Sequence, residues 1–284
     1  KSAMANTFTV ENTKTLNFIL YNKLRDWTAI IRKMHKEKKN LEQIRKKKME
    51  WMDEFYRILS IFLGLPPEKF DWSYRDKDKK FHRDLAMTPQ EFAQKYTGID
   101  MDDVYILWHC PSEKTPLNKT YLIEYTAYMK GGSDLIALNL PFKKLRSYAV
   151  KMLKNKEACI FGCDVLQESH TKEGLLYSGL YDYELIFQTK FSLDKGMRLD
   201  YCQSFMNHSM VLSGVDLVRN RPIKWKVENS WGTDYGKKGY FTMSDEWFSE
   251  HTYEVMIPGK YLDEEDKKLF KLKPVVLPRW FPMI

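Results

Sequence analysis

His208 and Asn229 are the residues whose types and spacing point most directly to chemistry. His208 begins a run of small and apolar residues typical of a strand, and a second extended run ends at Asn229. The polar group Arg219–Pro222 predicts a turn, and antiparallel strands that fold back there bring the two side chains close together. An asparagine oxygen that accepts from one ring nitrogen orients an imidazole and leaves its other nitrogen free for proton transfer. The pattern therefore predicts a proton-transfer pair.

Trp231 is placed to cover this pair. It lies two residues after Asn229, so a regular strand would put both side chains on one face, and the indole would keep water from the hydrogen bond. Gly232, Gly236 and Gly239 allow a tight, irregular turn before the next strand. The alternatives are a hydrogen-bonded core histidine at His208, a turn asparagine at Asn229 and a buried tryptophan without a functional role.

The elements that must position the pair are helical first and sheet-rich later. Apolar residues at helical spacing predict one helix from about Asn12 and a second from Leu41 to Leu63. Thr88–Glu91 reads as the capped start of a short helix, and Pro141 opens another. Extended apolar runs predict strands at residues 104–108, 158–163, 206–218, 223–228 and 239–243.

This order predicts an α+β protein with three regions. Residues 1–150 form a mainly helical region that includes a basic helical hairpin at about residues 12–63. Residues 151–270 form a sheet-rich half that carries His208 and Asn229, and residues 271–284 form a C-terminal tail.

The composition excludes several classes of protein. The 284 residues are 43% hydrophobic and 30% charged, with 13 Gly and 11 Pro, which excludes disordered and collagenous chains. No apolar run is long enough to span a membrane, so we expect no membrane partner. Four cysteines are too few for a disulfide scaffold and fit a reducing, cytoplasmic location. The cysteines and His109 also lack the spacing of metal ligands.

The positive charge is concentrated in the predicted hairpin. Nine Lys or Arg residues and two Glu residues lie between Arg32 and Lys48, a net charge of +7 out of +8 for the whole chain. Such a cluster indicates weak binding of nucleic acid or another polyanion, or else a solvated hairpin tip.

Several motifs resemble a known family. A histidine that begins a strand, then ENSWG, then a glycine-rich turn into GY, resembles the C-terminal half of a papain-like cysteine protease site. The segments WSYRDKDK, IFGCDV, KWKVENSWG, DEWFSEHTYEV and VVLPRWFPM resemble the bleomycin hydrolase family. These motifs match in order from near Asn12 to the C-terminus, so the resemblance is specific.

The resemblance implies a fold and an activity. The fold would be a papain-like α+β fold, incomplete here, with the helical hairpin as an insertion. His208 would be the general base that takes the proton of a cysteine thiol, and Asn229 would orient it. The protein would be a cytoplasmic thiol aminopeptidase acting on peptides without a cofactor, assembled as a homohexamer around a positively lined channel.

The family's nucleophile is missing from these residues. In the family it lies in a Gln…Gly-x-Cys-Trp context, in a domain before the region that begins near Lys1. None of the four cysteines here precedes a tryptophan: Cys110, Cys159, Cys163 and Cys202. We therefore expect a C-terminal part of such an enzyme, inactive alone, because a base without a nucleophile contributes little. The alternative is a catalytically silent homologue that acts in assembly or in peptide or polyanion binding.

The tail departs from the family as well. The resemblance implies that the C-terminus enters the cleft and helps to recognise the substrate's amino group. Phe281 stands where the family usually has an acidic residue, and the family continues a few residues past the Pro-Met pair. This departure weakens the expectation of strict aminopeptidase behaviour, and the alternative is that residues 275–284 simply pack as a chain end.

Overall fold

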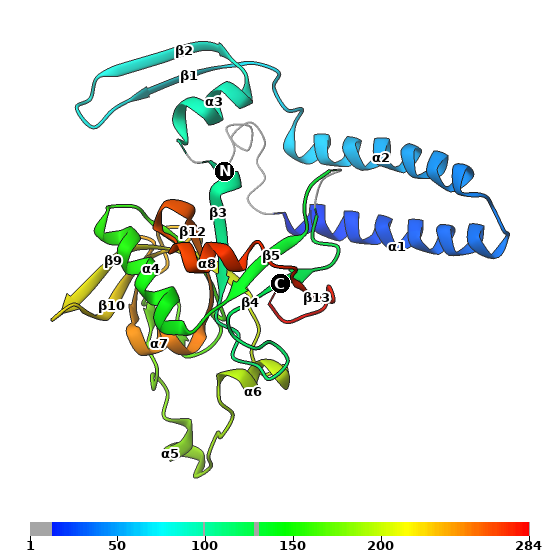
Figure 1. The fold of residues 1–284 in the computed structure, drawn as a ribbon. Coiled ribbons are helices and arrows are strands. Elements are labelled where there is room, and N and C mark those ends of the chain that lie inside the picture. Colours follow the sequence, from blue (N-terminus) through cyan, green and yellow to red (C-terminus); the bar gives the residue numbers. More distant parts are fainter. Residues whose placement is uncertain (1–12, 99, 128–130, 284) are drawn as a thin grey trace. The chain divides into compact units, whose positions relative to one another are not determined.

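A computed structural model describes residues 13–98, 100–127 and 131–283 (Figure 1). The chain divides into two compact units, Lys1–Ile99 and Asp100–Ile284. The expected boundary near residue 150 differs from this division, because residues 104–154 supply three strands and a helix to the second unit.

The predicted helical hairpin is present in the first unit. It consists of α1 (Lys14–Lys36) and α2 (Leu41–Leu63). The side chain of Asn40 accepts from the backbone N–H of Gln43 at 2.9 Å, which caps the start of α2. Trp27 and Trp51 stack with ring centroids 5.6 Å apart, so aromatic packing holds the helices together.

The first unit also contains a strand pair that the sequence analysis did not expect. β1 (Phe70–Arg75) and β2 (Phe81–Met87) are antiparallel, and α3 (Pro89–Tyr96) follows with the predicted Thr88 cap. Exposed and half-buried residues alternate along β1, which is the period of a strand. The description of residues 1–150 as mainly helical was therefore wrong between residues 70 and 139, where five strands lie.

The second unit is built on an eleven-stranded sheet with the order β13-β4-β5-β3-β12-β6-β9-β10-β11-β8-β7. Its strands are β3 (Val104–Trp108), β4 (Lys119–Ile123), β5 (Leu135–Asn139), β6 (Cys159–Cys163), β7 (Ser169–His170), β8 (Leu175–Leu176), β9 (His208–Val218), β10 (Arg221–Glu228), β11 (Tyr240–Ser244), β12 (Thr252–Pro258) and β13 (Val275–Leu277). The strands predicted around His208 and before Asn229 are confirmed, with ends that differ by one or two residues.

The second unit also contains five α-helices among its described residues. They are α4 (Phe142–Lys154), α5 (Tyr183–Phe187), α6 (Lys195–Asp200), α7 (Asp245–His251) and α8 (Glu264–Leu269), with short 3-10 turns at η2 (Met101–Asp103) and η3 (Gly259–Tyr261). α4 packs against β6, β9 and β12, and α7 packs against β10 and β11. Trp225, Trp247 and Phe248 are buried between α7 and the sheet, so the core fixes the strands that carry His208 and Asn229.

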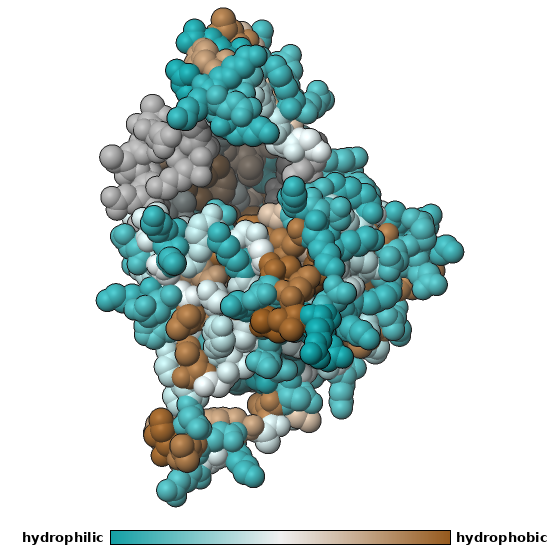
Figure 2. Space-filling view, turned by 90° about the vertical axis from the view of Figure 1, so that its left-hand side faces the viewer, coloured by the Kyte–Doolittle hydropathy of each residue, from teal (hydrophilic) through white to brown (hydrophobic). Residues whose placement is uncertain are grey.

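The segment around α5 projects from the second unit (Figure 1). Its exposed apolar side chains are Leu185, Ile186 and Phe187, each about two thirds or more exposed. Figure 2 shows this brown cluster at the lower end of the view. No helix within the described residues is long and apolar enough to cross a membrane.

Candidate active site

Three neighbouring strands position His208. β6 and β9 are antiparallel with Cys163 opposite His208, and β9 continues into β10 through a two-residue turn. Arg219 and Asn220, the two turn residues, both have positive φ angles, 50° and 62°. Two successive left-handed residues match the twist of a tight hairpin. A turn is therefore confirmed within the predicted Arg219–Pro222 segment, but it consists of Arg219 and Asn220 only, because Arg221 and Pro222 already belong to β10.

The structure brings His208 and Asn229 together. His208 Nε2 lies 3.0 Å from Asn229 Oδ1. The backbone N–H of Ser230 donates to the same oxygen at 2.8 Å, which fixes the end of the amide that faces the imidazole. Because Oδ1 can only accept, Nε2 carries the proton of this bond, and Nδ1 of a neutral imidazole keeps a free lone pair. The arrangement can take a proton at Nδ1.

Trp231 covers the pair from one side. Its ring centroid lies 4.8 Å from that of His208, and the ring planes are inclined by 32°. Tyr235 and Phe241 pack edge-on against the same indole. Asn229 is buried, with 9% of its surface exposed, and its Nδ2 has no hydrogen-bond partner within the described structure. The indole therefore covers one face of the imidazole, while 37% of its own surface stays exposed, so the alternative of a buried tryptophan is wrong.

The cysteines of the chain are free, and three of them are buried. Burial raises the pKa of Cys159 to about 12 and holds the pKa values of Cys110 and Cys163 above their usual range. Cys163 lies opposite His208 in the sheet, but a thiol that stays protonated is a poor nucleophile. Cys202 is exposed on the turn that ends α6.

The C-terminal tail runs along the start of β9. The backbone N–H of Met206, two residues before His208, donates to the carbonyl oxygen of Pro282 at 3.1 Å. Phe281 stacks on Trp108 at 6.4 Å between centroids, and Met283 is fully buried. Residue 284 lies outside the described residues. The tail is thus packed next to the strand that carries the candidate base.

Two further polar residues at this site were missed by the sequence analysis. Asn207 immediately precedes His208, and its side-chain Nδ2 donates to the buried carboxylate of Asp164. Asp164 lies within the IFGCDV segment, just after β6. The signal that would have found them is a buried Asp at one strand end and an Asn beside the histidine on the adjacent strand. Sequence alone gives no register between those strands.

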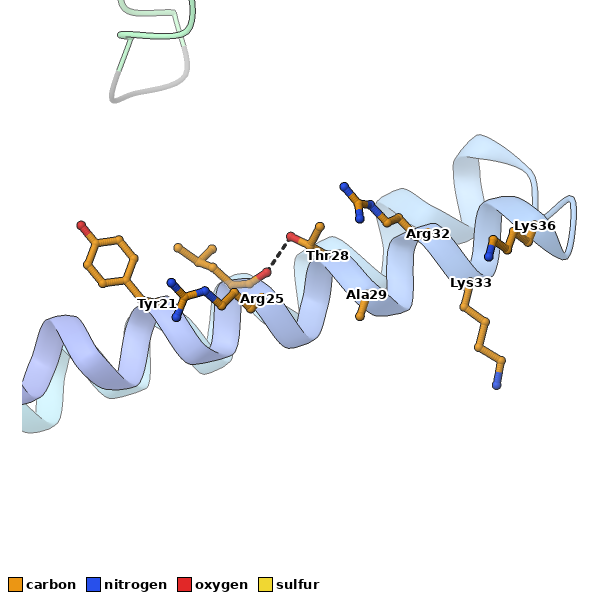
Figure 3. A pocket seen from close by; sticks show the side chains of 8 residues that line it. Tyr21, Arg25, Thr28, Ala29, Arg32, Lys33 and Lys36 are labelled. Atoms are coloured by element: carbon orange, nitrogen blue, oxygen red, sulfur yellow. Dashed lines mark hydrogen bonds between the residues drawn. The ribbon is translucent and has the colours of Figure 1, made fainter. Parts of the chain in front are cut away.

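The first unit carries a separate basic hollow along α1, of about 650 Å³ (Figure 3). It is lined by Tyr21, Leu24, Arg25, Thr28, Ala29, Arg32, Lys33 and Lys36. It contains part of the basic cluster found in the sequence. Among the described residues, no group of three or more His, Cys, Asp or Glu side chains could hold a metal ion.

Comparison with known proteins assigns the family. The model of the Peptidase C1-like family matches residues 1–284. The chain belongs to the Peptidase C1-like family. The papain-like α+β fold predicted from the sequence is confirmed by the family match and by a solved relative. That relative, PepW from Lactobacillus rhamnosis HN001, is 42% identical with a TM-score of 0.92, over 95% of this chain and 61% of its own.

Curated relatives agree with this Peptidase C1-like assignment. Aminopeptidase C of Lactobacillus delbrueckii subsp. lactis is 38% identical over 100% of this chain and 64% of its own length. Bleomycin hydrolase of Homo sapiens is 36% identical over 100% of this chain and 64% of its own length. The resemblance to the bleomycin hydrolase family is therefore confirmed. The chain spans a little under two thirds of the length of these relatives.

Proposed function

We propose that this chain supplies the base side of a thiol aminopeptidase active site, with the nucleophilic cysteine on polypeptide outside these 284 residues. The observation that carries the proposal is the 3.0 Å contact between His208 Nε2 and Asn229 Oδ1, which leaves Nδ1 as the proton acceptor. Relatives named aminopeptidase C and bleomycin hydrolase support the same activity class. The absence of a Cys-Trp pair from the sequence supports an external nucleophile.

In the proposed reaction, His208 Nδ1 takes the proton of the thiol. The thiolate attacks the carbonyl carbon of the first amide bond of a peptide, and the imidazolium gives its proton to the leaving amine. Water then hydrolyses the thioester, with His208 taking the water's proton and returning it to the thiol. Asn229 holds the imidazole in one orientation through both steps, and Trp231 keeps water away from that contact.

The test is an assay of the chain alone and in complex. The chain is co-expressed with the segment of Lactobacillus delbrueckii aminopeptidase C that has no counterpart here, and the complex is assayed with an aminoacyl-aminomethylcoumarin. We expect no thiol-dependent turnover from the chain alone. We expect turnover from the complex, blocked by a thiol alkylator. His208→Gln should reduce it by a factor of about 10² to 10⁴, the usual contribution of general-base catalysis.

His170→Gln is the matched control, because His170 is exposed and lies on the two-residue strand β7. It should leave turnover unchanged. Alkylator-sensitive turnover by the chain alone would contradict the external nucleophile. A complex that assembles but stays inactive would favour the catalytically silent homologue.

We propose a cytoplasmic, homohexameric enzyme that acts on peptide N-termini. The exposed apolar side chains on α5 support an association with other protein surfaces. The packed tail beside Met206 supports a role for the C-terminus near the substrate, while Phe281 lacks the charge that would attract an amine.

Polyanion binding is the second candidate function, and the basic hollow on α1 is the observation that favours it. Arg25, Arg32, Lys33 and Lys36 line the hollow on a single helix, so an anionic chain could lie along it; Arg32 and Lys33 extend in opposite directions from α1 in the view of Figure 3. Retention on a heparin column that falls steeply with salt would support polyanion binding. Elution already at low salt would contradict it.

A further inference from the structure

Asp164 and Asn207 lie at the same end of two adjacent strands. Asp164 follows Cys163, the last residue of β6, and Asn207 precedes His208, the first residue of β9. Cys163 and His208 are opposite each other in the register of the two strands. The two polar side chains therefore meet where β9 begins, directly beside the candidate base.

Asn207 fastens this end of β9 to β6 with three hydrogen bonds. Its backbone N–H donates to Cys163 O at 3.0 Å. Its side-chain Oδ1 accepts from the backbone N–H of Val165 at 3.0 Å, and its Nδ2 donates to Asp164. One residue thus contacts three successive residues of the neighbouring segment through both its backbone and its amide. The position of the His208 backbone follows from these contacts.

Asp164 is a buried anchor for this arrangement, with 1% of its surface exposed. Its carboxylate also accepts from Ser204 Oγ at 2.7 Å and from Gln167 Nε2 at 3.0 Å. No ion pair involves Asp164 within residues 13–98, 100–127 and 131–283. A buried carboxylate without a cation is stable only when several donors satisfy it. Asp164 therefore gathers the segment before β9 around one point.

The imidazole itself has few supports. The described contacts of the His208 ring are one hydrogen bond to Asn229 and one face against Trp231. Neither contact fixes the backbone from which the ring extends. A displacement of about 1 Å in a reacting group can reduce a rate about a hundredfold.

We infer that Asp164 and Asn207 form a positioning unit that holds His208 in the orientation needed for proton transfer. The inference rests on the proposed role of His208 as the base. In this inference the two residues act on His208 through its backbone, which Asn207 ties to the end of β6.

The test observes His208 directly in the full chain. Long-range ¹H–¹⁵N NMR reports the tautomer of each of the six histidines, and His208→Gln assigns the His208 signals. The wild-type chain should show His208 as the Nε2–H tautomer. We expect Asn207→Ala and Asp164→Asn to produce a mixture of His208 tautomers. Gln167→Ala is the matched control, because it removes a donor to Asp164 without touching Asn207.

Kinetics of the complemented enzyme give the second readout. We expect Asn207→Ala and Asp164→Asn to lower kcat about tenfold or more with little change in KM, while Gln167→Ala stays close to wild type. If Asp164→Asn does not fold, Asn207→Ala alone carries the test, since it removes the side-chain hydrogen bonds to Asp164 and to the backbone of Val165. Unchanged His208 signals in the folded variants would overturn the inference, whatever the activity. Shifted signals in an enzyme that does not need His208 would instead contradict the proposed function.

Discussion

At the scale of single residues, the direction of one hydrogen bond decides what His208 can do. Ser230 N–H and His208 Nε2–H converge on Asn229 Oδ1, so the amide cannot flip without losing both donors. This contact could be predicted from the sequence, since residue types and spacing were enough to place an Asn near a His. The contacts between Asp164 and Asn207 could not be predicted, because the hydrogen-bond donors to a buried carboxylate are visible only in the folded structure.

The burial of the Lys195 side chain can be tested through the pH dependence of stability. It is buried in α6, and its Nζ donates to the carbonyl oxygens of Ser249 and Thr252. Burial lowers its pKa from 10.5 to about 7. The unfolded chain therefore binds more protons than the folded chain between these pH values. Burying the charged amine destabilises the fold below about pH 7, and this penalty fades as the pH rises toward 10.5.

The variant Lys195→Met removes this titration. We expect the free energy of unfolding of wild type minus that of the variant to rise with pH between about 7 and 10.5. The slope should reach at most about 1.4 kcal/mol per pH unit, the value for one proton. Urea unfolding of both proteins at each pH measures it, and the titration of other groups cancels in the difference. A difference that is independent of pH would show that Lys195 is not buried as described.

At the scale of elements, the β9–β10 hairpin and the turn after Asn229 build the site. The hairpin was predicted because polar turn residues separate two extended runs. Its register was not, because bulges shift the pairing between Pro222 and Lys224 and again between Lys226 and Val227. Bulges leave little trace in a single sequence. The strand pair β1–β2 was not predicted, because its residues alternate mainly between exposed and half-buried and so give only a weak hydrophobic pattern.

Gly236 tests whether the turn supports the indole over His208. It has φ +61°, and an added Cβ would lie 2.4 Å from the carbonyl oxygen of Tyr240. Gly179 also has a positive φ, +76°, but open space around it, so it is the matched control. Each Ala substitution introduces about 1–2 kcal/mol of left-handed strain. We expect Gly236→Ala to lose more stability than Gly179→Ala. We also expect it to change the tryptophan emission of the protein, through the surroundings of Trp231.

Thermal unfolding and tryptophan emission of the two glycine variants measure this difference. Equal losses in Gly236→Ala and Gly179→Ala, with unchanged emission, would show that the close approach of Gly236 to the Tyr240 carbonyl has no importance for the turn.

At the scale of the whole molecule, the chain is two units of a Peptidase C1-like protein, and its proposed chemistry depends on polypeptide outside it. The family motifs in the sequence predicted the fold class correctly. The division at Ile99 was not predicted, because strands from both sides of residue 150 pair with one another in one sheet. Composition and periodicity report local structure and do not report which strands pair.

The most direct measurement is the pH dependence of cysteine alkylation in the complemented enzyme. An ordinary cysteine thiol has a pKa of about 8.5. If His208 takes the thiol proton, iodoacetamide should modify the nucleophile at a pH well below this value. In His208→Gln the alkylation profile should move up to that of an isolated thiol. A profile that is the same with and without His208 would contradict the pairing of this imidazole with the external cysteine.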